Sequence, residues 1–162
     1  MRYEYTVETE DLAKYYQMGE VVVKALDGID LRIRRGEYLS IMGPSGSGKS
    51  TFLHLAGALD RPTRGRVLIE GRDPNKMSDE ELSRLRNELI GFVFQTFNLI
   101  PRLTALENVM LPLAIKGVDG EERMRRAREA LEMVGLAHRM NHRPMELSGG
   151  EQQRVAIARA IV

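Results

Sequence analysis

The sequence predicts a mixed α/β fold, and the order of its N-terminal elements is the main reason. Residues 21–33 and 38–42 are rich in β-branched and apolar side chains and are separated by RRGE, which predicts strand, turn and strand. The second predicted strand runs directly into the glycine-rich stretch GPSGSGKST at 43–51. After that stretch, apolar residues recur at the spacing of one helix face: Phe52, Leu55, Ala56 and Leu59. Strand, glycine loop and helix in this order indicate an α/β domain.

The rest of the chain adds two strands and a series of helices. Residues 66–71 predict a short strand that ends at a glycine, and 90–95 predict a buried strand that ends in a polar residue. Helices are predicted to begin where a Ser, Thr or Asp is followed three residues later by Glu: Ser78, Thr104, Asp119 and Ser148. Pro112 predicts a break or bend in its helix, and Gly135 predicts a helix end.

Composition and charge narrow the class of protein. The 162 residues are 43% hydrophobic and 29% charged, values close to those of soluble globular proteins. A net charge of +1 gives no long-range field that would attract nucleic acid, so no nucleic-acid partner is expected. The absence of Cys excludes disulfides and thiolate metal sites. No stretch approaches the roughly 18 apolar residues of a membrane span, so work at a membrane would need an anchoring partner.

The glycine-rich stretch is the first candidate site, because it matches the pattern G-x-x-x-x-G-K-[ST]. Glycines let backbone N–H groups turn inward around phosphates, and the following helix points its positive end at the same anion. Lys49 is expected to neutralise the β- and γ-phosphates, and the Ser50 hydroxyl to bind Mg²⁺. The expected phosphate-binding residues are Gly43, Pro44, Ser45, Gly46, Ser47, Gly48, Lys49, Ser50 and Thr51.

This loop by itself does not separate a kinase, a GTPase, a helicase or a transporter motor. The GTPase interpretation is disfavoured, because the only Asn-Lys pair, at Asn75, is not followed by the carboxylate that pairs with guanine. Glu70 follows a short strand and could order Mg²⁺, but its strand lies between two glycine turns and is not expected to be central. His54, His138 and His142 have no metal-binding spacing.

A second candidate site is LSGGEQQR at 147–154. Ser148 is a helix N-cap with Glu151 three residues on, and the N–H groups of Gly149 and Gly150 point out of the same helix start. Together with the helix dipole they would make a second anion-binding helix end. The local residues are equally compatible with a plain capping box and a Gly-Gly turn.

At these residues the chain resembles the ABC-type ATPases. LSGGEQQ resembles the signature motif of that family, GPSGSGKST its Walker A loop, and Gln95 the glutamine of its Q-loop, in the family's order and approximate spacing. The stretches ALDGIDL, GEYLSIMGPSGSGKSTFLHLAGALDRPTRG and IGFVFQTFNLIPRLTALENVMLPL are similar to the macrolide-export and lipoprotein-release ATPases. The similarity covers nearly the whole chain.

The resemblance implies a P-loop NTPase fold with a RecA-like core, an antiparallel β subdomain and an inserted α-helical subdomain. Residues 1–95 would hold the β subdomain and the P-loop core, 96–147 the helical subdomain, and 148–162 the signature helix. The helical region between Gln95 and Ser148 would be the surface that meets the membrane subunit. Its stretch FNLIPRLTALENV, 97–109, could form a docking groove there, although a loop covering the core fits it nearly as well.

The resemblance also implies roles for single residues. Tyr16 would stack on adenine, with Tyr15 as an adjacent rival, and Gln95 would contact Mg²⁺ and the attacking water. The signature residues would bind the γ-phosphate of ATP held by the Lys49 of a second subunit: Ser148, Gly149, Gly150 and Glu151. This arrangement requires a head-to-tail homodimer with ATP and Mg²⁺ between the subunits. The implied partner is a transmembrane permease, which would hold the protein at the cytoplasmic face of the cell membrane.

In the family, the chain continues past the signature helix to an Asp that orders Mg²⁺, a Glu that polarises water and a switch His. The sequence up to Val162 contains none of these three family residues. We therefore expect the chain to be the N-terminal part of an ATPase, the C-terminal part of the core to be missing, and the 162 residues alone not to turn over ATP. Exposed apolar faces are expected at Ile41, at Val93 and on the last helix. The alternative functions are a non-transport ABC ATPase and an ATP-dependent assembly module without hydrolysis.

Overall fold

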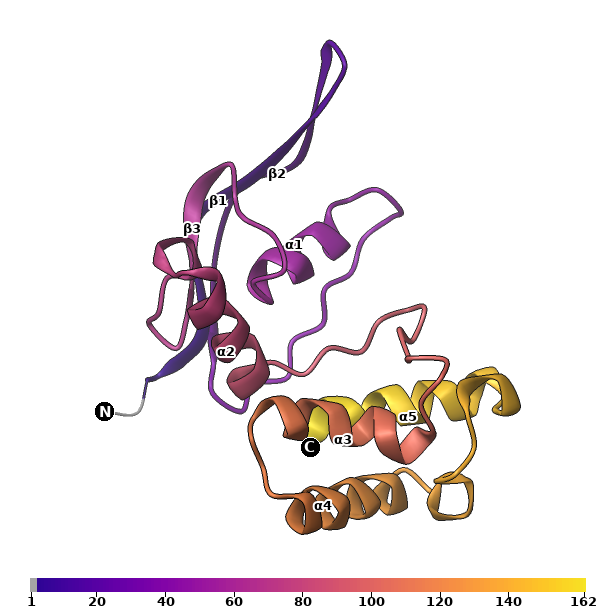
Figure 1. Cartoon of the computed structure of the whole chain (residues 1–162). Helices are drawn as coiled ribbons and strands as arrows, with labels where there is room; N and C mark the ends of the chain where they lie inside the picture. The colour runs from indigo at the N-terminus through magenta and orange to yellow at the C-terminus, as the bar shows by residue number, and fades with distance from the viewer. Residues whose placement is uncertain (1–2) are drawn as a thin grey trace. The chain divides into compact units, whose positions relative to one another are not determined.

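The computed structural model describes residues 3–162 (Figure 1). The chain forms two compact units, of which the first ends at Leu82 and the second spans Ser83–Val162. The boundary falls within one helix, α2 (Asp79–Leu89). Each unit has its own buried apolar residues.

The first unit is built on a three-stranded antiparallel sheet with the order β2-β1-β3. Its strands are β1 (Tyr5–Met18), β2 (Val21–Arg34) and β3 (Arg64–Ile69). β1 and β2 form the long hairpin seen in Figure 1. Their two-residue turn begins with Gly19, whose φ of 62° is a conformation that glycine adopts without strain. The strands predicted at 21–33 and 66–71 are thereby confirmed.

The central strand β1 is not predicted by its sequence, and its irregular pairing explains why. Thr9, Leu12 and Ala13 are its buried residues, so the buried side chains do not alternate strictly with exposed ones. The register with β2 shifts between Thr9 and Leu12 and again up to Tyr15. Each β-bulge moves the following side chains to the other face of the sheet, which removes the two-residue period that identifies a strand.

Helix α1 (Lys49–Ala56) follows the glycine loop as predicted, but it is shorter than its apolar pattern suggests. Phe52 and Leu55 are buried, whereas Leu59 lies beyond the end of the helix and is exposed. The helix stops at Gly57, and the chain turns at Ala58, which has a positive φ of 54°. The prediction that Leu59 continues the helix face is therefore wrong.

The strands predicted at 38–42 and 90–95 are not present as strands. Tyr38 is 93% exposed and Met42 is 86% exposed, and Ile41 and Val93 are exposed as expected. A strand is held by hydrogen bonds from a neighbouring strand. Within residues 3–162 neither segment has such a neighbour, so both run as extended backbone outside any sheet.

The second unit is helical, with α3 (Ala105–Ile115), α4 (Gly120–Met133) and α5 (Gly149–Ile161) following α2. All four predicted helix starts are confirmed, and Thr104 and Ser148 form complete capping boxes. Pro112 does not break its helix, because α3 continues through it to Ile115. Three short 3-10 helices are also present. η1 (Pro74–Lys76) belongs to the first unit, and η2 (Ala137–Arg139) and η3 (Pro144–Glu146) belong to the second.

Helices α3, α4 and α5 pack around one apolar core, with each helix placing small or branched side chains at the centre. Its buried members are Ala105, Val109, Ala127, Ala130, Leu131, Leu136, Leu147, Val155 and Ala158. Asn108 is the polar exception, since it is fully buried on α3. Across residues 3–162, no helix combines the length and the apolar character needed to cross a bilayer.

Candidate nucleotide-binding site

The predicted site residues fall in both units. The glycine loop and Tyr16 belong to the first unit, and Gln95 and the residues around Ser148 belong to the second. Within the first unit, the loop joins the exposed segment 38–42 to the N-terminus of α1. Within the second unit, Gln95 precedes α3 and Ser148 starts α5.

Gly48 fixes the start of α1 against the sheet. It is the N-cap residue and has a φ of 88°. A Cβ atom added to it would lie 2.3 Å from the carbonyl oxygen of Ala25 on β2. Only glycine fits both the left-handed backbone and this close approach. The loop glycine therefore positions the N–H groups at the helix start relative to β2.

Among residues 3–162, no side chain caps the N-terminus of α1, so its first N–H groups can bind an anion. Gly48 has no side chain to accept a hydrogen bond, and the first turn of the helix contains no acidic residue. The first N–H groups of a helix have no intrahelical acceptors, and together with the helix dipole they favour a negative charge. This helix end thus lacks the carboxylate that would compete with a phosphate.

Lys49 supplies the positive charge of the loop. Its Nζ atom donates to the carbonyl oxygens of Gly43, at 2.8 Å, and of Pro44, at 2.7 Å, and lies 3.3 Å from Ser47 Oγ. These acceptors are neutral groups of the loop itself. They hold the ammonium at the loop, and within residues 3–162 no carboxylate pairs with it.

A cavity of about 370 Å³ lies beside the loop in the first unit. Gly43, Pro44, Ser47, Gly48 and Lys49 line one part of it, and apolar residues of β2, of segment 38–42 and of α1 line the rest. The Ser50 hydroxyl is exposed and makes no hydrogen bond within residues 3–162. A larger hollow of about 1090 Å³ runs along α4 and contains none of the predicted site residues.

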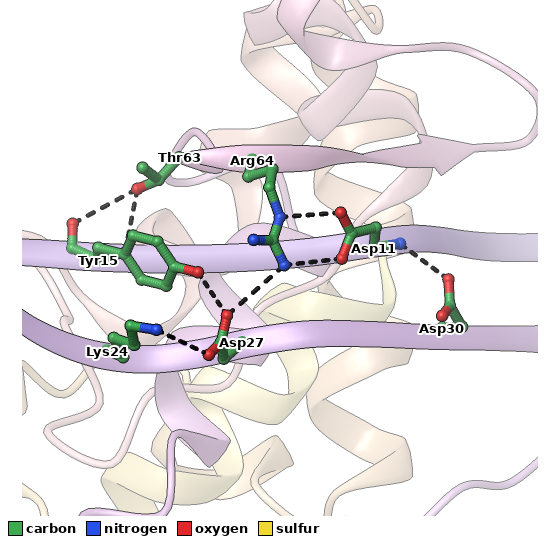
Figure 2. Close-up of polar contacts among 7 residues, drawn as sticks. All are labelled: Asp11, Tyr15, Lys24, Asp27, Asp30, Thr63 and Arg64. Carbon is green, nitrogen blue, oxygen red and sulfur yellow. Dashed lines mark hydrogen bonds and ion pairs between the residues drawn. The ribbon is translucent and has the colours of Figure 1, made fainter.

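The Tyr15 hydroxyl forms part of a polar network on the sheet surface (Figure 2). Its hydroxyl donates to Asp27, which also accepts from Lys24 and pairs with Arg64. The hydrogen bond to Asp27 raises the pKa of Tyr15, and the same bond lowers the pKa of Asp27. The ammonium of Lys24 also lies 5.3 Å from the centre of the Tyr15 ring.

Tyr16 has a different environment. Its ring is 38% exposed, and its hydroxyl donates to Asp60 Oδ2 at 3.2 Å. Lys14 Nζ lies 5.2 Å from the ring centre and 2.7 Å from Asp60 Oδ1. Although partial burial of Asp60 acts in the other direction, its hydrogen bonds from Lys14 and from the Arg61 backbone lower its pKa. Lys14 and Asp60 thus fix the orientation of the Tyr16 ring.

Gln95 lies at the exposed end of segment 90–95. Its side chain makes no hydrogen bond with the described part of the chain, so its amide is available to an outside group. The backbone just after it is unusual, since Phe97 and Asn98 have φ values of 59° and 49°. Two successive non-glycine residues in the left-handed region form a strained turn.

Ser148 and Glu151 form the predicted capping box at the start of α5. Glu151 Oε2 accepts from the Ser148 backbone at 2.8 Å and from its hydroxyl at 2.9 Å, and the Ser148 hydroxyl accepts from the Glu151 N–H at 3.3 Å. The Ser148 backbone and hydroxyl bonds, followed by the charge of Arg139, lower the pKa of Glu151. Arg139 Nε lies 3.1 Å from Glu151 Oε1 and partly balances its charge.

Gly149 and Gly150 are not required by the packing of this chain. A Cβ atom at Gly149 would meet nothing within 4 Å, and one at Gly150 would meet only the end of the Arg154 side chain, at 3.8 Å. Neither glycine has a positive φ. Glycine weakens a helix relative to alanine, so the internal structure gives no reason for this pair. Two open glycines leave room for a group from outside to approach the helix start closely.

Several residues that shape the site are not recognisable from the local sequence. Asp60 accepts a hydrogen bond from Tyr16, which lies 44 residues away in the sequence. Arg139 pairs with Glu151, which lies 12 residues away. The capping Glu151 carries the one local signal, because it stands three residues after Ser148. Among residues 3–162, no three His, Cys, Asp or Glu side chains gather as a metal cluster.

Comparison with known proteins gives the family. The family model described as ABC transporter matches residues 26–162. The lipoprotein-releasing system ATP-binding protein LolD of Geobacter metallireducens is 54% identical over 156 residues, which are 96% of this chain and 69% of LolD. The macrolide export ATP-binding/permease protein MacB of Chlorobaculum tepidum is 51% identical, with 96% of this chain and 24% of MacB covered.

The fold agrees with the same family. The solved dimeric structure of the ATP-binding cassette MJ0796, in a post-hydrolysis state bound to ADP and Pi, superposes with a TM-score of 0.91. It is 54% identical, and the match covers 96% of this chain and 68% of that one. The chain spans about two thirds of the length of its ATP-binding relatives, including 66% of one from Thermotoga maritima. With a family model over residues 26–162 and this fold, the chain belongs to the ABC transporter family.

Proposed function

We propose that this protein is the ATP-binding subunit of an ABC transporter and couples ATP binding and hydrolysis to export or extraction through a membrane partner. The observation that carries the proposal is the geometry of the glycine loop. Gly48 packs closely against Ala25, and among residues 3–162 no side chain caps the start of α1 and no carboxylate pairs with the Lys49 ammonium. These features fit a polyphosphate group.

In this proposal the loop residues hold the nucleotide phosphates. The Lys49 ammonium exchanges its bonds to the Gly43 and Pro44 carbonyls for bonds to the β- and γ-phosphates. The free N–H groups of the α1 start bind the same oxygens. Tyr16, oriented by Lys14 and Asp60, stacks on the adenine with its exposed face.

Magnesium is part of the proposed site on the family resemblance, which assigns Ser50 and Gln95 as its ligands. Mg²⁺ prefers oxygen ligands, and the Ser50 hydroxyl and the Gln95 amide both offer an oxygen that is not engaged within residues 3–162. When bound, the ion would neutralise charge on the phosphates. Gln95 is proposed also to orient the attacking water, which makes Lys49 and Gln95 the catalytic residues of this chain.

The signature residues are proposed to act on ATP that a second copy holds. Ser148, Gly149, Gly150 and Glu151 form the start of α5, and the two glycines leave space for a group of the partner to approach it. The dimeric structure of MJ0796 supports this arrangement, because that relative is a dimer bound to ADP and Pi. A head-to-tail homodimer of this chain would place each loop opposite the signature residues of the other copy.

The relatives also support the transport assignment. LolD belongs to a lipoprotein-releasing system, and MacB is an export ATP-binding/permease protein. We therefore infer a transmembrane permease partner and a peripheral position at the cytoplasmic face of the membrane. The division into a β subdomain and P-loop core at 1–95, a helical subdomain at 96–147 and a signature helix at 148–162 is proposed on the same resemblance.

Hydrolysis needs a group that polarises water as well as groups that hold phosphate. Residues 1–162 supply groups that hold phosphate. The family resemblance gives no carboxylate among them the role of polarising water. A polypeptide of these 162 residues is thus proposed to bind ATP without turnover, while the complete ATPase hydrolyses it.

ATP binding to purified wild-type chain, measured by equilibrium dialysis, tests the proposal. The Lys49→Ala variant should lose about 10- to 100-fold in affinity, since it removes charge-assisted bonds to phosphate. Lys76→Ala is the matched control, because Lys76 is an exposed lysine on η1 whose ammonium lies 3.8 Å from Asp73 Oδ2. Equal ATP affinity in wild type and Lys49→Ala would overturn the proposal.

A further inference from the structure

The strained turn after Gln95 is held by one side chain of α5. Arg159 donates from Nη2 to the carbonyl oxygen of Phe97 at 2.8 Å and from Nη1 to that of Asn98 at 2.6 Å. These two acceptors belong to the two residues with left-handed backbone. A planar guanidinium can donate to two neighbouring acceptors at once, so it can fix this turn in one conformation.

A second contact holds the other side of Gln95 to the same helix. A Cβ atom at Gly91 would lie 2.1 Å from the carbonyl oxygen of Ala160 and 2.9 Å from its carbonyl carbon. The backbone at 91 therefore packs directly on the backbone of α5. Gln95 is thus flanked by two contacts, at 91 and at 97–98, which fall on adjacent residues of one helix.

The guanidinium of Arg159 is partly buried and contacts neutral groups. Within residues 3–162 it has no carboxylate partner, and its hydrogen bonds go to carbonyl groups. Burial lowers its pKa. Holding a partly desolvated charge without a counter-charge is unfavourable, and a neutral apolar side chain would avoid it. The planar guanidinium provides two N–H donors in a fixed arrangement, and these donors join the carbonyl groups of Phe97 and Asn98.

Helix α5 connects this contact to the signature residues. Ser148 caps its N-terminus, and Val155 and Ala158 anchor it in the core of the second unit. At the helical rise per residue, about 16 Å separate Ser148 from Arg159. On the far side of the turn, the buried Asn108 accepts from the Ile100 N–H at 2.8 Å and donates to Thr104 O at 2.9 Å. The segment after Gln95 is therefore held at both ends.

We propose that Arg159 is a positioning residue that clamps the segment 91–98 to α5, so that Gln95 and the helix start at Ser148 move as one body. The inference rests on the proposed roles of Gln95 and Ser148 in ATP hydrolysis. A shift of the signature helix would then be transmitted to the amide that orients water, and a shift of the Gln95 segment would be transmitted to the signature residues.

Hydrogen exchange followed by mass spectrometry tests the clamp without any reference to activity. Arg159→Gln removes the charge and the fork, and it should speed exchange of the two hydrogen-bonded amides of the turn, Phe97 and Asn98, by about tenfold while the amides of α3 and α4 stay protected. Arg159→Lys retains donors and should keep most of the protection. Arg128→Gln, an exposed arginine on α4, is the matched control. Unchanged exchange of the Phe97 and Asn98 amides in Arg159→Gln would overturn the proposal.

A double-variant cycle then tests whether Arg159 acts through Gln95. In the assembled, ATP-hydrolysing protein, Arg159→Gln should lower kcat by about 10- to 100-fold, the cost of misplacing a catalytic group, with ATP affinity unchanged. On a Gln95→Ala background, the same substitution should have no further effect. Effects that multiply would show that Arg159 acts independently of Gln95 and would overturn the proposal.

Gly91→Ala provides a second, independent variant. It leaves Arg159 intact but pushes the segment away from Ala160, so it should reproduce the loss of kcat and the faster exchange. Normal kcat and exchange in Gly91→Ala would contradict the clamp. Failure of the proposed function has a different signature, because Lys49→Ala would then retain ATP affinity whatever the exchange at 91–99 shows.

Discussion

The Nζ atom of Lys49 lies 2.8 Å from the carbonyl oxygen of Gly43, which opens the same loop. The ammonium therefore bonds to the loop that it is proposed to serve, and its acceptors are neutral carbonyl groups. Such bonds can be exchanged for stronger charge-assisted bonds to phosphate without leaving a buried anion unpaired. The loop carbonyl groups therefore hold the Lys49 ammonium in position before a phosphate binds.

Two glycine substitutions should have opposite effects on stability. Gly48→Ala brings a Cβ atom against Ala25 O at 2.3 Å in a left-handed backbone, so the free energy of unfolding should fall by about 1–3 kcal/mol. Gly149→Ala meets open space at a helix start and should leave stability unchanged or raise it by up to about 1 kcal/mol. Urea unfolding curves of the two variants give the comparison.

The same Gly149→Ala variant should weaken ATP-dependent association of two copies, because the added methyl group occupies the space left for the partner. Analytical ultracentrifugation with and without ATP measures this. Wild-type association combined with wild-type stability would show that the open glycines have no role in assembly.

Tyr16 and Tyr15 can be separated by matched substitutions. Tyr16→Leu removes the proposed stacking surface and should weaken ATP binding by about 5- to 100-fold, the usual range for loss of one base-aromatic stack. Tyr15→Leu disrupts the bond to Asp27 and should leave ATP affinity unchanged. Titration with ATP, with Tyr16→Phe as the control that keeps an aromatic ring, distinguishes them. A larger loss in Tyr15→Leu would transfer the stacking role to Tyr15.

Acid should weaken the start of α5 through Glu151. Its pKa in the folded state lies below the ordinary value of 4.5, because the charged form accepts bonds from Ser148. A lowered pKa stabilises the fold above the unfolded value, and this contribution is lost as the pH falls below about 4.5 and through the folded value. Unfolding free energy measured from pH 7 to pH 3 should therefore fall less in Glu151→Gln than in wild type.

Glu132→Gln on α4 is the control for that experiment, since Glu132 is exposed and belongs to no capping box. It should follow the wild-type curve. Identical pH dependence in wild type and Glu151→Gln would show that the Ser148 capping box contributes no pH-dependent stability.

Asn108 should be costly to remove. It is fully buried, and its amide pairs with the backbone of Ile100, Leu103 and Thr104. Asn108→Ala leaves the Ile100 N–H and the Leu103 carbonyl without the Asn108 amide, whereas the Ile100 and Thr104 carbonyls keep backbone donors, and this should cost about 1–3 kcal/mol. Denaturant unfolding measures the loss. A smaller loss than for an exposed substitution such as Asn141→Ala would contradict the role assigned to the amide.

Features that depend on neighbours in sequence are the ones that could be predicted. The capping boxes at Thr104 and Ser148 are formed between residues three apart, and the loop from Gly43 to α1 depends on glycines and one lysine within a few residues. Their chemistry is complete within a single turn, so the residue pattern alone determined them. The family resemblance added expected roles for Tyr16 and Gln95, which local pattern does not assign.

Tertiary structure alone decided the features that join distant residues. β1 is a strand because β2 and β3 pair with it, whereas 38–42 and 90–95 have strand-like composition but no strand to pair with among residues 3–162. Arg159 meets Phe97 from 62 residues away, and Asp60 meets Tyr16 from 44. Strand pairing and long-range hydrogen bonds depend on which segments the fold brings together, and that is a property of the whole chain rather than of any short pattern.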